Sequence, residues 1–359
     1  MRTTPIPGTG PYRIAYAIRK KTRYVRNPFF HEWSHAAQPA GNPDVIVMRY
    51  GMDPTQELRA VERGEADWSA DGVPAKLLSQ LTTRYASRLH SYPGSDTEFL
   101  QINTTLPPFD DLRVRRALNY AIDRRVVTRL FGGPAAATPA CQVLPPGLFG
   151  YSPYSPYTRR PGRHAWRAPD LELARRLVGA SHTHGEAVTV WGTPNDPTVQ
   201  HRVIPYIVTV LRWLGYKTRA HIVPGTFFQN APAGIFRTIQ MTPRGWADTA
   251  PYNFFAPWFA CDSPYNHHWF CGPALDRKIV ETQALEATDP RAAAAEWAAL
   301  DRLVTDRAAW GAARKPSRDR FPLGPRRQLP TPPGARADRR PAHRELIEDS
   351  GRVSAVRSA

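Results

Sequence analysis

Strand-like and helix-like segments alternate through most of the chain, and this alternation constrains the fold more than any other feature of the sequence. Residues 44–50 (DVIVMRY) alternate apolar and polar side chains as a strand does, and residues 54–64 follow with the spacing of a short amphipathic helix. The same change recurs after 99–103 (FLQIN), and again from 188–191 to 199–214. This order predicts a mixed α/β architecture.

The helical patterns carry recognisable start signals. Asp110 or Asp111 is predicted to cap a helix whose apolar side chains recur three and four residues apart as far as residue 130. The helix at 199–214 is expected to bend at Pro205. Further helices are predicted at 274–287 and 291–310.

Length and composition narrow the class of protein. A chain of 359 residues can form two or three domains, and a hydrophobic content of 42% excludes disorder of the whole chain. No run of 18 uncharged apolar residues occurs, so no spanning helix is predicted. The first 25 residues hold no apolar segment followed by a cleavage site, so no secretory signal is predicted either.

The last part of the chain differs in kind. Residues 311–359 hold 12 Arg and Lys against 5 Asp and Glu, together with seven prolines, and follow neither a helical nor a strand period. Such a stretch buries too little surface to offset its ordering entropy, so we expect disorder. Its abrupt onset suggests the hypothesis of a shifted reading frame. The net charge of +17 predicts only weak, salt-sensitive association with polyanions.

No motif typical of a catalytic site occurs. The sequence has no Gly-x-Ser-x-Gly elbow, no phosphate-binding Gly-x-x-x-x-Gly-Lys loop, no dinucleotide fingerprint and no His-Glu-x-x-His helix. These absences are not decisive by themselves, but they leave no catalytic motif. We expect a protein that is not an enzyme and needs no cofactor, and a metal-dependent enzyme built on Cys261, His267, His268 and Cys271 is the least favoured alternative.

A cluster of cysteines and histidines permits three interpretations. Cys261, His267, His268 and Cys271 could bind zinc, but nine residues separate the cysteines, whereas zinc sites usually place them two to four apart. A disulfide that closes this loop would stabilise the fold by a little under ~3 kcal/mol in an oxidising compartment. We favour the disulfide over unpaired thiols and over a metal, and Cys141 would then remain single.

Asp248 is an acidic residue within a segment of nine aromatic side chains, residues 246–270. A carboxylate is costly to bury unless a cation meets it. That cation could come from the protein or from the ammonium group of a ligand, or the carboxylate could simply be exposed.

Several short motifs occur in a fixed order along the chain. They are GTGPY at 8–12, RNP at 26–28, NPD at 42–44, GEAD at 64–67, FLQIN at 99–103, PFDD at 108–111, VRRAL at 114–118, AID at 121–123, LPPG at 144–147, GWAD at 245–248 and NFF at 253–255. In this order they resemble the family-5 extracellular solute-binding proteins of ABC importers, the oligopeptide, dipeptide and nickel group.

The resemblance implies a fold, a function and a site. The fold would be a two-lobed α/β clamp of the periplasmic-binding-protein type II, which captures an oligopeptide between its lobes and delivers it to an ABC permease and its ATPase subunits. Asp248 matches the family's aspartate that binds the peptide α-ammonium group, with Trp246 and Tyr252 as an aromatic wall and Asn103 as a hinge residue. The family is extracytoplasmic, as cell-surface lipoproteins or periplasmic proteins, and meets the membrane only through the transporter, with no specific nucleic-acid partner.

The chain also departs from the family. We expect a partial first lobe at 1–98, a second lobe at 99–312 and a basic Pro/Arg-rich disordered tail at 313–359. Without a signal peptide, the chain as written is predicted to stay cytoplasmic, and a clamp with one lobe incomplete is expected to bind peptide feebly or not at all. The alternative function is polyanion or nucleic-acid binding through the tail.

Overall fold

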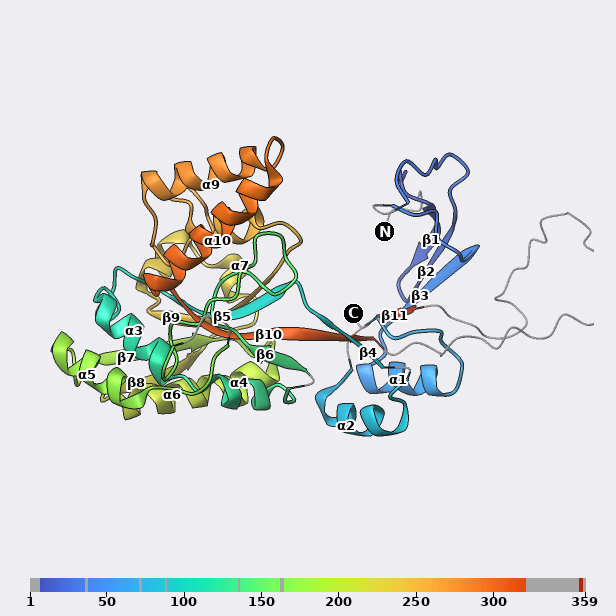
Figure 1. The fold of residues 1–359 in the computed structure, drawn as a ribbon. Helices are drawn as coiled ribbons and strands as arrows, with labels where there is room; N and C mark the ends of the chain where they lie inside the picture. Colours follow the sequence, from blue (N-terminus) through green and yellow to red (C-terminus); the bar gives the residue numbers. More distant parts are fainter. Residues whose placement is uncertain are drawn as a thin grey trace, which may run out of the picture. The chain divides into compact units, whose positions relative to one another are not determined.

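The described part of the chain forms two compact units. The computed structural model describes residues 7–35, 38–70, 73–87, 89–134, 136–161, 165–320 and 355–357. Unit 1 comprises Met1–Ser91 and Arg318–Ala359, and unit 2 comprises Tyr92–Ser317, so the chain leaves unit 1 once and returns to it once. Both units combine helices with a sheet, which confirms the mixed α/β architecture (Figure 1). Among the described helices, none has the length and apolar character needed to cross a membrane.

Unit 1 contains a sheet with the strand order β1-β2-β3-β11. Strands β1 (Tyr12–Ile18), β2 (Lys21–Arg26) and β3 (Val45–Tyr50) are antiparallel neighbours, and β11 (Ala355–Arg357) runs parallel to β3. The strand predicted at 44–50 is therefore present as β3.

Two helices complete unit 1, α1 (Pro54–Glu62) and α2 (Ala75–Arg84). Asp53 starts α1 with a capping box, because its carboxylate accepts the backbone N–H of Gln56 while the Gln56 side chain accepts the N–H of Asp53. The apolar faces of the helices and β3 form a small core of Val47, Leu58, Ala60, Val61, Ala66 and Leu81.

Unit 2 is built on a sheet with the order β4-β10-β5-β9-β7-β8, and β6 pairs with β10. The strands are β4 (His90–Pro93), β5 (Asp96–Ile102), β6 (Ala137–Pro139), β7 (Ala187–Gly192), β8 (Lys217–Ile222), β9 (Met241–Ala247) and β10 (Trp310–Arg320). β5 is antiparallel to β9 and β10, whereas β7 is parallel to β8 and β9. The first and last segments of unit 2 are hydrogen-bonded to each other, because the backbone N–H of Gly94 donates to the carbonyl of Pro316 at 2.9 Å.

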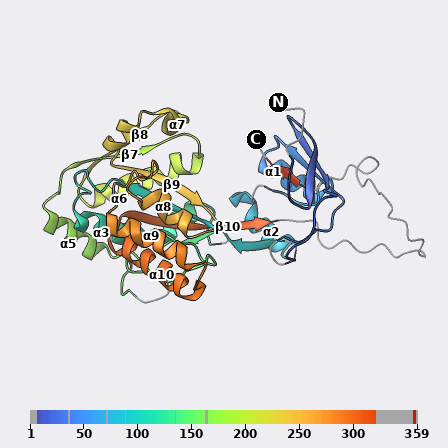
Figure 2. The ribbon, with the colours of Figure 1, turned by 90° about the horizontal axis from the view of Figure 1, so that it is seen from above.

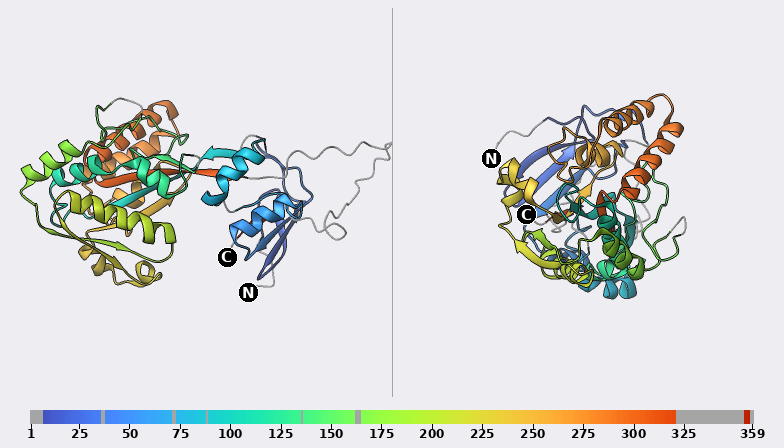
Figure 3. Two further views of the ribbon diagram at one scale, coloured as in Figure 1. Left: turned by 90° about the horizontal axis from the view of Figure 1, so that it is seen from below. Right: turned by 90° about the vertical axis from the view of Figure 1, so that its left-hand side faces the viewer.

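The sheet of unit 2 separates two hydrophobic cores, because successive side chains of a strand point to opposite faces. Leu100 of β5 packs in one core with α3 (Leu112–Ala121), α4 (Arg124–Leu130), α5 (Leu171–Ser181) and α6 (Ile204–Trp213). Phe99 packs in the other with α8 (Tyr252–Phe259), α9 (Pro273–Leu285) and α10 (Pro290–Asp306). Figures 1 and 2 show α9 and α10 on one side of this sheet, and the view from below in Figure 3 brings α4 and α6 to the front.

Two predicted helices are divided in the structure. The helix expected from Asp111 to residue 130 is interrupted at Ile122, which is extended, and Asp123 then caps α4 by accepting the backbone N–H of Arg125 at 2.8 Å. The helix expected at 199–214 is a π-helical turn (Val199–Val203) followed by α6. The break between α3 and α4 arises because Asp123 acts as a second N-cap inside a stretch whose apolar spacing is otherwise continuous.

The predicted start of the disordered tail is wrong. The helix expected to run to residue 310 ends at Asp306, and the chain continues as β10 between β5 and β6 up to Arg320. Burial of Arg314 and Lys315 explains the difference, because both cations find acceptors in unit 2: the half-buried carboxylate of Glu98 and the buried carbonyl of Leu144. The remaining tail, apart from β11, lies outside the described residues, and so does most of the segment on which the polyanion hypothesis depends.

A buried carboxylate on α10 holds the proline-rich loop that follows β6. Asp301 accepts hydrogen bonds from the Gln142 side chain at 2.7 Å and from the backbone N–H groups of Val143 at 2.7 Å and Leu144 at 3.1 Å. Burial raises the pKa of Asp301, while the nearby Lys315 ammonium and these hydrogen bonds oppose the rise. The loop is thus fixed against the sheet by polar bonds inside unit 2.

Candidate functional site

The three side chains predicted to bind ligand lie together on one strand–turn–helix segment. Trp246 is near the end of β9, Asp248 follows the strand directly, and Tyr252 is the first residue of α8. Asn253 links them, because its backbone carbonyl accepts the indole N–H of Trp246 at 2.8 Å and its side-chain amide donates to Asp248 at 3.0 Å. The geometry therefore fixes the acid and the indole relative to each other.

The carboxylate of Asp248 is half-buried and is held through one oxygen. Oδ1 accepts the backbone N–H of Thr249 at 2.6 Å and of Ala250 at 3.1 Å, in addition to the bond from Asn253. Partial burial disfavours the charged form, but the hydrogen bonds from Asn253, Ala250 and Thr249 outweigh it and lower the pKa of Asp248. Within the described residues, no hydrogen bond reaches Oδ2, so a charged carboxylate with an open oxygen results.

The predicted aromatic wall is partly a core element. Trp246 meets Trp258 edge to face with ring centroids 5.3 Å apart, and it lies 6.4 Å from the ring of Tyr265. Trp246 and Tyr252 are half-buried against the core that contains Phe99, whereas Tyr265 is 55% exposed. The indole thus has a packed side and a side that remains accessible.

A cavity of about 280 Å³ lies where β7 and β9 separate. The two strands pair at Val190 and Met241, and beyond this pair the cavity occupies the space that the sheet leaves. Its lining comes from β5, β9, α4, the end of β7 and the segment after it, namely Glu98, Phe99, Leu100, Val127, Phe131, Gly192, Thr193, Asn195, Asp196, Val199, Val203, Phe228, Thr242, Pro243, Arg244 and Gly245.

Arg244 is the cation of this cavity, and sequence analysis did not single it out. Its Nε donates to the side-chain carbonyl of Gln101 at 3.2 Å, and its guanidinium carbon lies 4.2 Å from the ring centroid of Phe228. Burial lowers the pKa of Arg244 to about 10, which leaves the side chain charged at neutral pH. The sequence did offer a signal for Arg244: it lies two residues before Trp246 on the same strand, so the two side chains point to the same face.

The acidic residue Glu98 in the cavity wall already has a partner. Arg314 of β10 donates to both of its carboxylate oxygens, at 2.6 and 3.1 Å, and packs 3.6 Å above the ring of Phe131. Burial raises the pKa of Glu98, and the charge of Arg314 opposes that rise. This ion pair joins two strands of the sheet.

Asn103, predicted as a hinge residue, is buried directly after β5. Its backbone N–H donates to Gln240 at 2.9 Å, its amide donates to Arg237 at 3.3 Å, and its Oδ1 accepts the backbone N–H of Thr105 at 3.0 Å. All of these partners belong to unit 2, and the chain crosses between the units at other positions. The hinge role stays a prediction.

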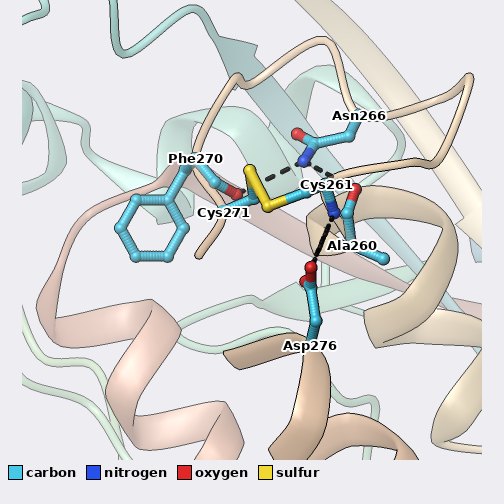
Figure 4. Close-up of a disulfide and its surroundings, with 6 residues drawn as sticks. All are labelled: Ala260, Cys261, Asn266, Phe270, Cys271 and Asp276. Atoms are coloured by element: carbon cyan, nitrogen blue, oxygen red, sulfur yellow. Dashed lines mark hydrogen bonds between the residues drawn. A yellow bond between two sulfur atoms is a disulfide. The ribbon is translucent and has the colours of Figure 1, made fainter. Parts of the chain in front are cut away.

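Cys261 and Cys271 form a disulfide that closes the loop after α8 (Figure 4). The side chain of Asn266 points into this loop and donates to the carbonyls of Ala260 at 3.0 Å and Phe270 at 3.4 Å. Cys141 is a free thiol. The disulfide uses both cysteines of the zinc alternative, and the described part of the chain holds no group of three or more His, Cys, Asp and Glu side chains that could bind a metal ion.

Comparison with known proteins identifies the class to which this fold and this segment belong. The profile of the bacterial extracellular solute-binding proteins, family 5 (middle region) matches residues 2–266. Because this range is most of the chain, the protein belongs to that family of solute-binding proteins.

Individual relatives agree with this assignment. The chain is 26% identical over 313 residues to the glutathione-binding protein GsiB of Shigella dysenteriae, which covers 84% of this chain and 57% of the relative. It is 27% identical to the probable di/tripeptide-binding protein 5 of Pseudomonas aeruginosa, over 86% of this chain and 56% of the relative. The chain thus spans a little over half the length of these proteins.

A solved structure supports the fold. The clavulanic acid biosynthesis oligopeptide binding protein 2 superposes with a TM-score of 0.74 at 23% identity, which covers 87% of this chain and 58% of that chain. The predicted fold class, the α/β fold of the periplasmic peptide-binding proteins, is therefore confirmed.

Proposed function

We propose that the protein is the substrate-binding subunit of an ABC importer and captures oligopeptides outside the cytoplasm. Membership of family 5 supports this proposal, and so do its relatives, which include a glutathione-binding protein and a probable di/tripeptide-binding protein. The protein binds and releases the peptide unchanged, so it is not an enzyme. Its partners are the peptide and the permease with its ATPase subunits, and it meets the membrane only through that transporter.

The proposal depends on the carboxylate of Asp248, which has one oxygen held by hydrogen bonds and one oxygen open. A peptide presents an α-ammonium group whatever its sequence, and a carboxylate with an open oxygen is the matching acceptor. Three hydrogen bonds hold Oδ1 in place, so the remaining oxygen is oriented before a ligand arrives. Preorganisation of this kind lowers the entropic cost of binding.

The aromatic side chains next to Asp248 strengthen the same interaction. Trp246 is locked by its hydrogen bond to Asn253, and Tyr252 packs on the same core. Rings that displace water around an ion pair reduce the local dielectric constant and thereby increase the attraction between the charges. We assign Asp248 the role of ammonium acceptor and Trp246 and Tyr252 the role of its aromatic surroundings.

Calorimetric titration with trialanine and N-acetyl-trialanine tests this assignment. A charge-assisted hydrogen bond contributes about 1.5–3 kcal/mol, so Asp248→Asn should weaken trialanine binding by roughly 10- to 100-fold. Asparagine keeps the Oδ1 acceptor for Thr249 and Ala250 and should preserve the turn. Acetylation removes the ammonium charge, so the acetylated peptide should bind the parent weakly and lose nothing further in the variant.

Asp262, an exposed aspartate in the loop after α8, provides a matched control. Asp262→Asn removes one negative charge without touching the proposed acceptor, and it should leave the affinity for trialanine unchanged. Equal affinity of the parent and Asp248→Asn for trialanine would contradict the assignment of Asp248. Absence of binding of any short peptide to the parent protein would contradict the proposed function of this chain, and it would agree with the feeble binding that the sequence analysis expects of a clamp with one incomplete lobe.

A further inference from the structure

We propose that Cys141 is a site of reversible S-thiolation, at which its thiol forms a mixed disulfide with a small thiol that carries a carboxylate group. The site is a cavity of about 230 Å³ next to β6, and Lys315 and Ser155 in its wall bind the carboxylate. The proposal goes beyond peptide binding and does not depend on it, because Trp246 and Asp248 are not part of this wall.

The cavity is lined by the end of β6, by the loop that follows β6 and by β10. Pro139, Pro146 and Trp166 give it apolar walls. Asp301 holds the loop in place, because it accepts hydrogen bonds from the side chain of Gln142 and from two backbone N–H groups. Sites that enclose a drug-sized ligand measure about 300–1,000 Å³, so this smaller cavity fits a smaller group, such as a thiol acid with a few carbon atoms.

The thiol of Cys141 is free and half-buried, so a small molecule in the cavity can reach it. Two cations lie near this thiol. Burial lowers the pKa of Arg124, and burial lowers the pKa of Lys315 to about 7, while the charge of Cys141 is among those that oppose both shifts. Reactive cysteines are partly exposed and have cations beside them, because the thiolate is the nucleophile. Cys141 has both features.

The amine of Lys315 has donors that the protein does not use. An ammonium group offers three N–H groups, and one of them donates to the carbonyl of Leu144. Among the described residues, no carboxylate forms an ion pair with Lys315, because Asp301 acts on it only at longer range. With a pKa of about 7, Lys315 is charged in about half of the molecules at pH 7, and a carboxylate beside it favours the charged form.

The hydroxyl of Ser155 indicates a ligand independently of the thiol and the amine. Ser155 is 4% exposed and lines the cavity, and its hydroxyl has no hydrogen-bond partner in the part of the chain that the structure describes. Its oxygen is not sealed from the open space. Because buried hydroxyl groups are nearly always hydrogen-bonded, this donor needs a partner in the cavity, and a carboxylate oxygen is a suitable one.

A low-molecular-weight disulfide is the co-reactant of the modification. Cys141 loses its proton to solvent, and its thiolate attacks one sulfur of the reagent. The sulfur–sulfur bond of the reagent breaks as the new bond to Cys141 forms, and the second sulfur leaves as a thiolate that takes up a proton. One disulfide is consumed and one is formed, so no other oxidant is needed. The paired Cys261 and Cys271 agree with an oxidising compartment, in which disulfides persist.

Two symmetrical disulfides of similar size test the proposal. Dithiodipropionic acid carries a carboxylate on each half, whereas hydroxyethyl disulfide is neutral. Intact mass spectrometry at pH 7 follows the gain of one half-reagent by the parent protein and by a synthetic peptide of residues 137–145, which contains the same thiol without the cavity. The ratio of the rate with the acid to the rate with the neutral reagent should be about tenfold higher for the protein than for the peptide.

Four variants assign the effect to residues. Cys141→Ser should gain no adduct. Lys315→Met and Ser155→Ala should each lower the ratio toward that of the peptide, and a ratio of two rates in one variant is insensitive to a general change in the reactivity of the thiol. Lys217→Met removes an exposed ammonium group outside the cavity and should leave the ratio unchanged. If Lys315→Met does not fold, Ser155→Ala and the comparison of parent with peptide still decide.

Each outcome decides one part of the proposal. An adduct on the parent that forms faster with the acid, is absent from Cys141→Ser and is released by dithiothreitol supports the site. Absence of any adduct on the parent overturns it. Equal rate ratios for the parent and the peptide overturn recognition of the carboxylate by the cavity, and an unchanged ratio in Ser155→Ala and Lys315→Met overturns the roles of these two residues.

Discussion

His268 should make the folded state sensitive to acid. The ring is fully buried among aromatic side chains, stacked on Phe259 with centroids 5.4 Å apart and on Phe99 at 5.9 Å. Burial, with a smaller contribution from the neighbouring His267, lowers the pKa of His268 from 6.5 to about 3. The folded protein therefore holds a neutral ring at pH values where the unfolded chain binds a proton.

The sign and size of the effect follow from proton linkage. The contribution to stability is fully present above pH 6.5 and is lost as the pH falls from 6.5 toward 3, because the unfolded state then binds the extra proton. Between pH 7 and pH 5, about one and a half pKa units of this difference are expressed, which corresponds to about 2 kcal/mol. His267, whose pKa burial lowers to about 4, adds a loss in the same direction.

Urea unfolding followed by tryptophan fluorescence at pH 7 and pH 5 measures this loss. His268→Phe keeps an apolar ring in the same aromatic surroundings and removes the titration, so its loss on acidification should be about 2 kcal/mol smaller than that of the parent. His201→Gln, at an exposed position, should behave as the parent does. An unchanged acid sensitivity in His268→Phe would refute the reasoning.

Other predictions concern the stability of unit 2. Asp301→Ala should lower the free energy of unfolding by about 3–5 kcal/mol in urea titrations, because it removes the acceptor of three buried donors and the carboxylate whose charge favours the protonated Lys315; a loss below 1 kcal/mol would contradict this. Reduction of the disulfide between Cys261 and Cys271, which lie ten residues apart, should cost about 3 kcal/mol and lower the melting temperature by roughly 6–10 °C. Cys141→Ser should show the same shift on reduction, and the double serine variant of the paired cysteines should show none.

The alternation of strand and helix was predictable because its causes are local. The alternation with a period of two that forms β3 and the capping box that starts α1 both lie within residues 45–56. The break between α3 and α4 also has a local signal, the aspartate at 123, but the apolar spacing continues across it and conceals the break. At this position the N-cap decides the local structure, and the chain forms two helices although the apolar spacing alone predicts one.

β10 could not be predicted, because its causes are distant in sequence. The segment is basic and contains proline, yet Arg314 meets Glu98 across more than two hundred residues and Lys315 reaches the carbonyl of Leu144. In the candidate site, too, some residues were predictable from the local sequence and others were not. Asp248 and Trp246 stood out by their neighbours in sequence, whereas the burial of Arg244 depends on Phe228 and Gln101, which only the fold brings to it.

The bond between Gly94 and Pro316 has a consequence for engineering. It places the beginning and the end of unit 2 next to each other, and segments with adjacent termini tolerate transfer into new hosts and circular permutation. Residues 92–317 could therefore be grafted as a cassette into a loop of another protein, or their natural ends could be joined by a short linker and new ends opened elsewhere.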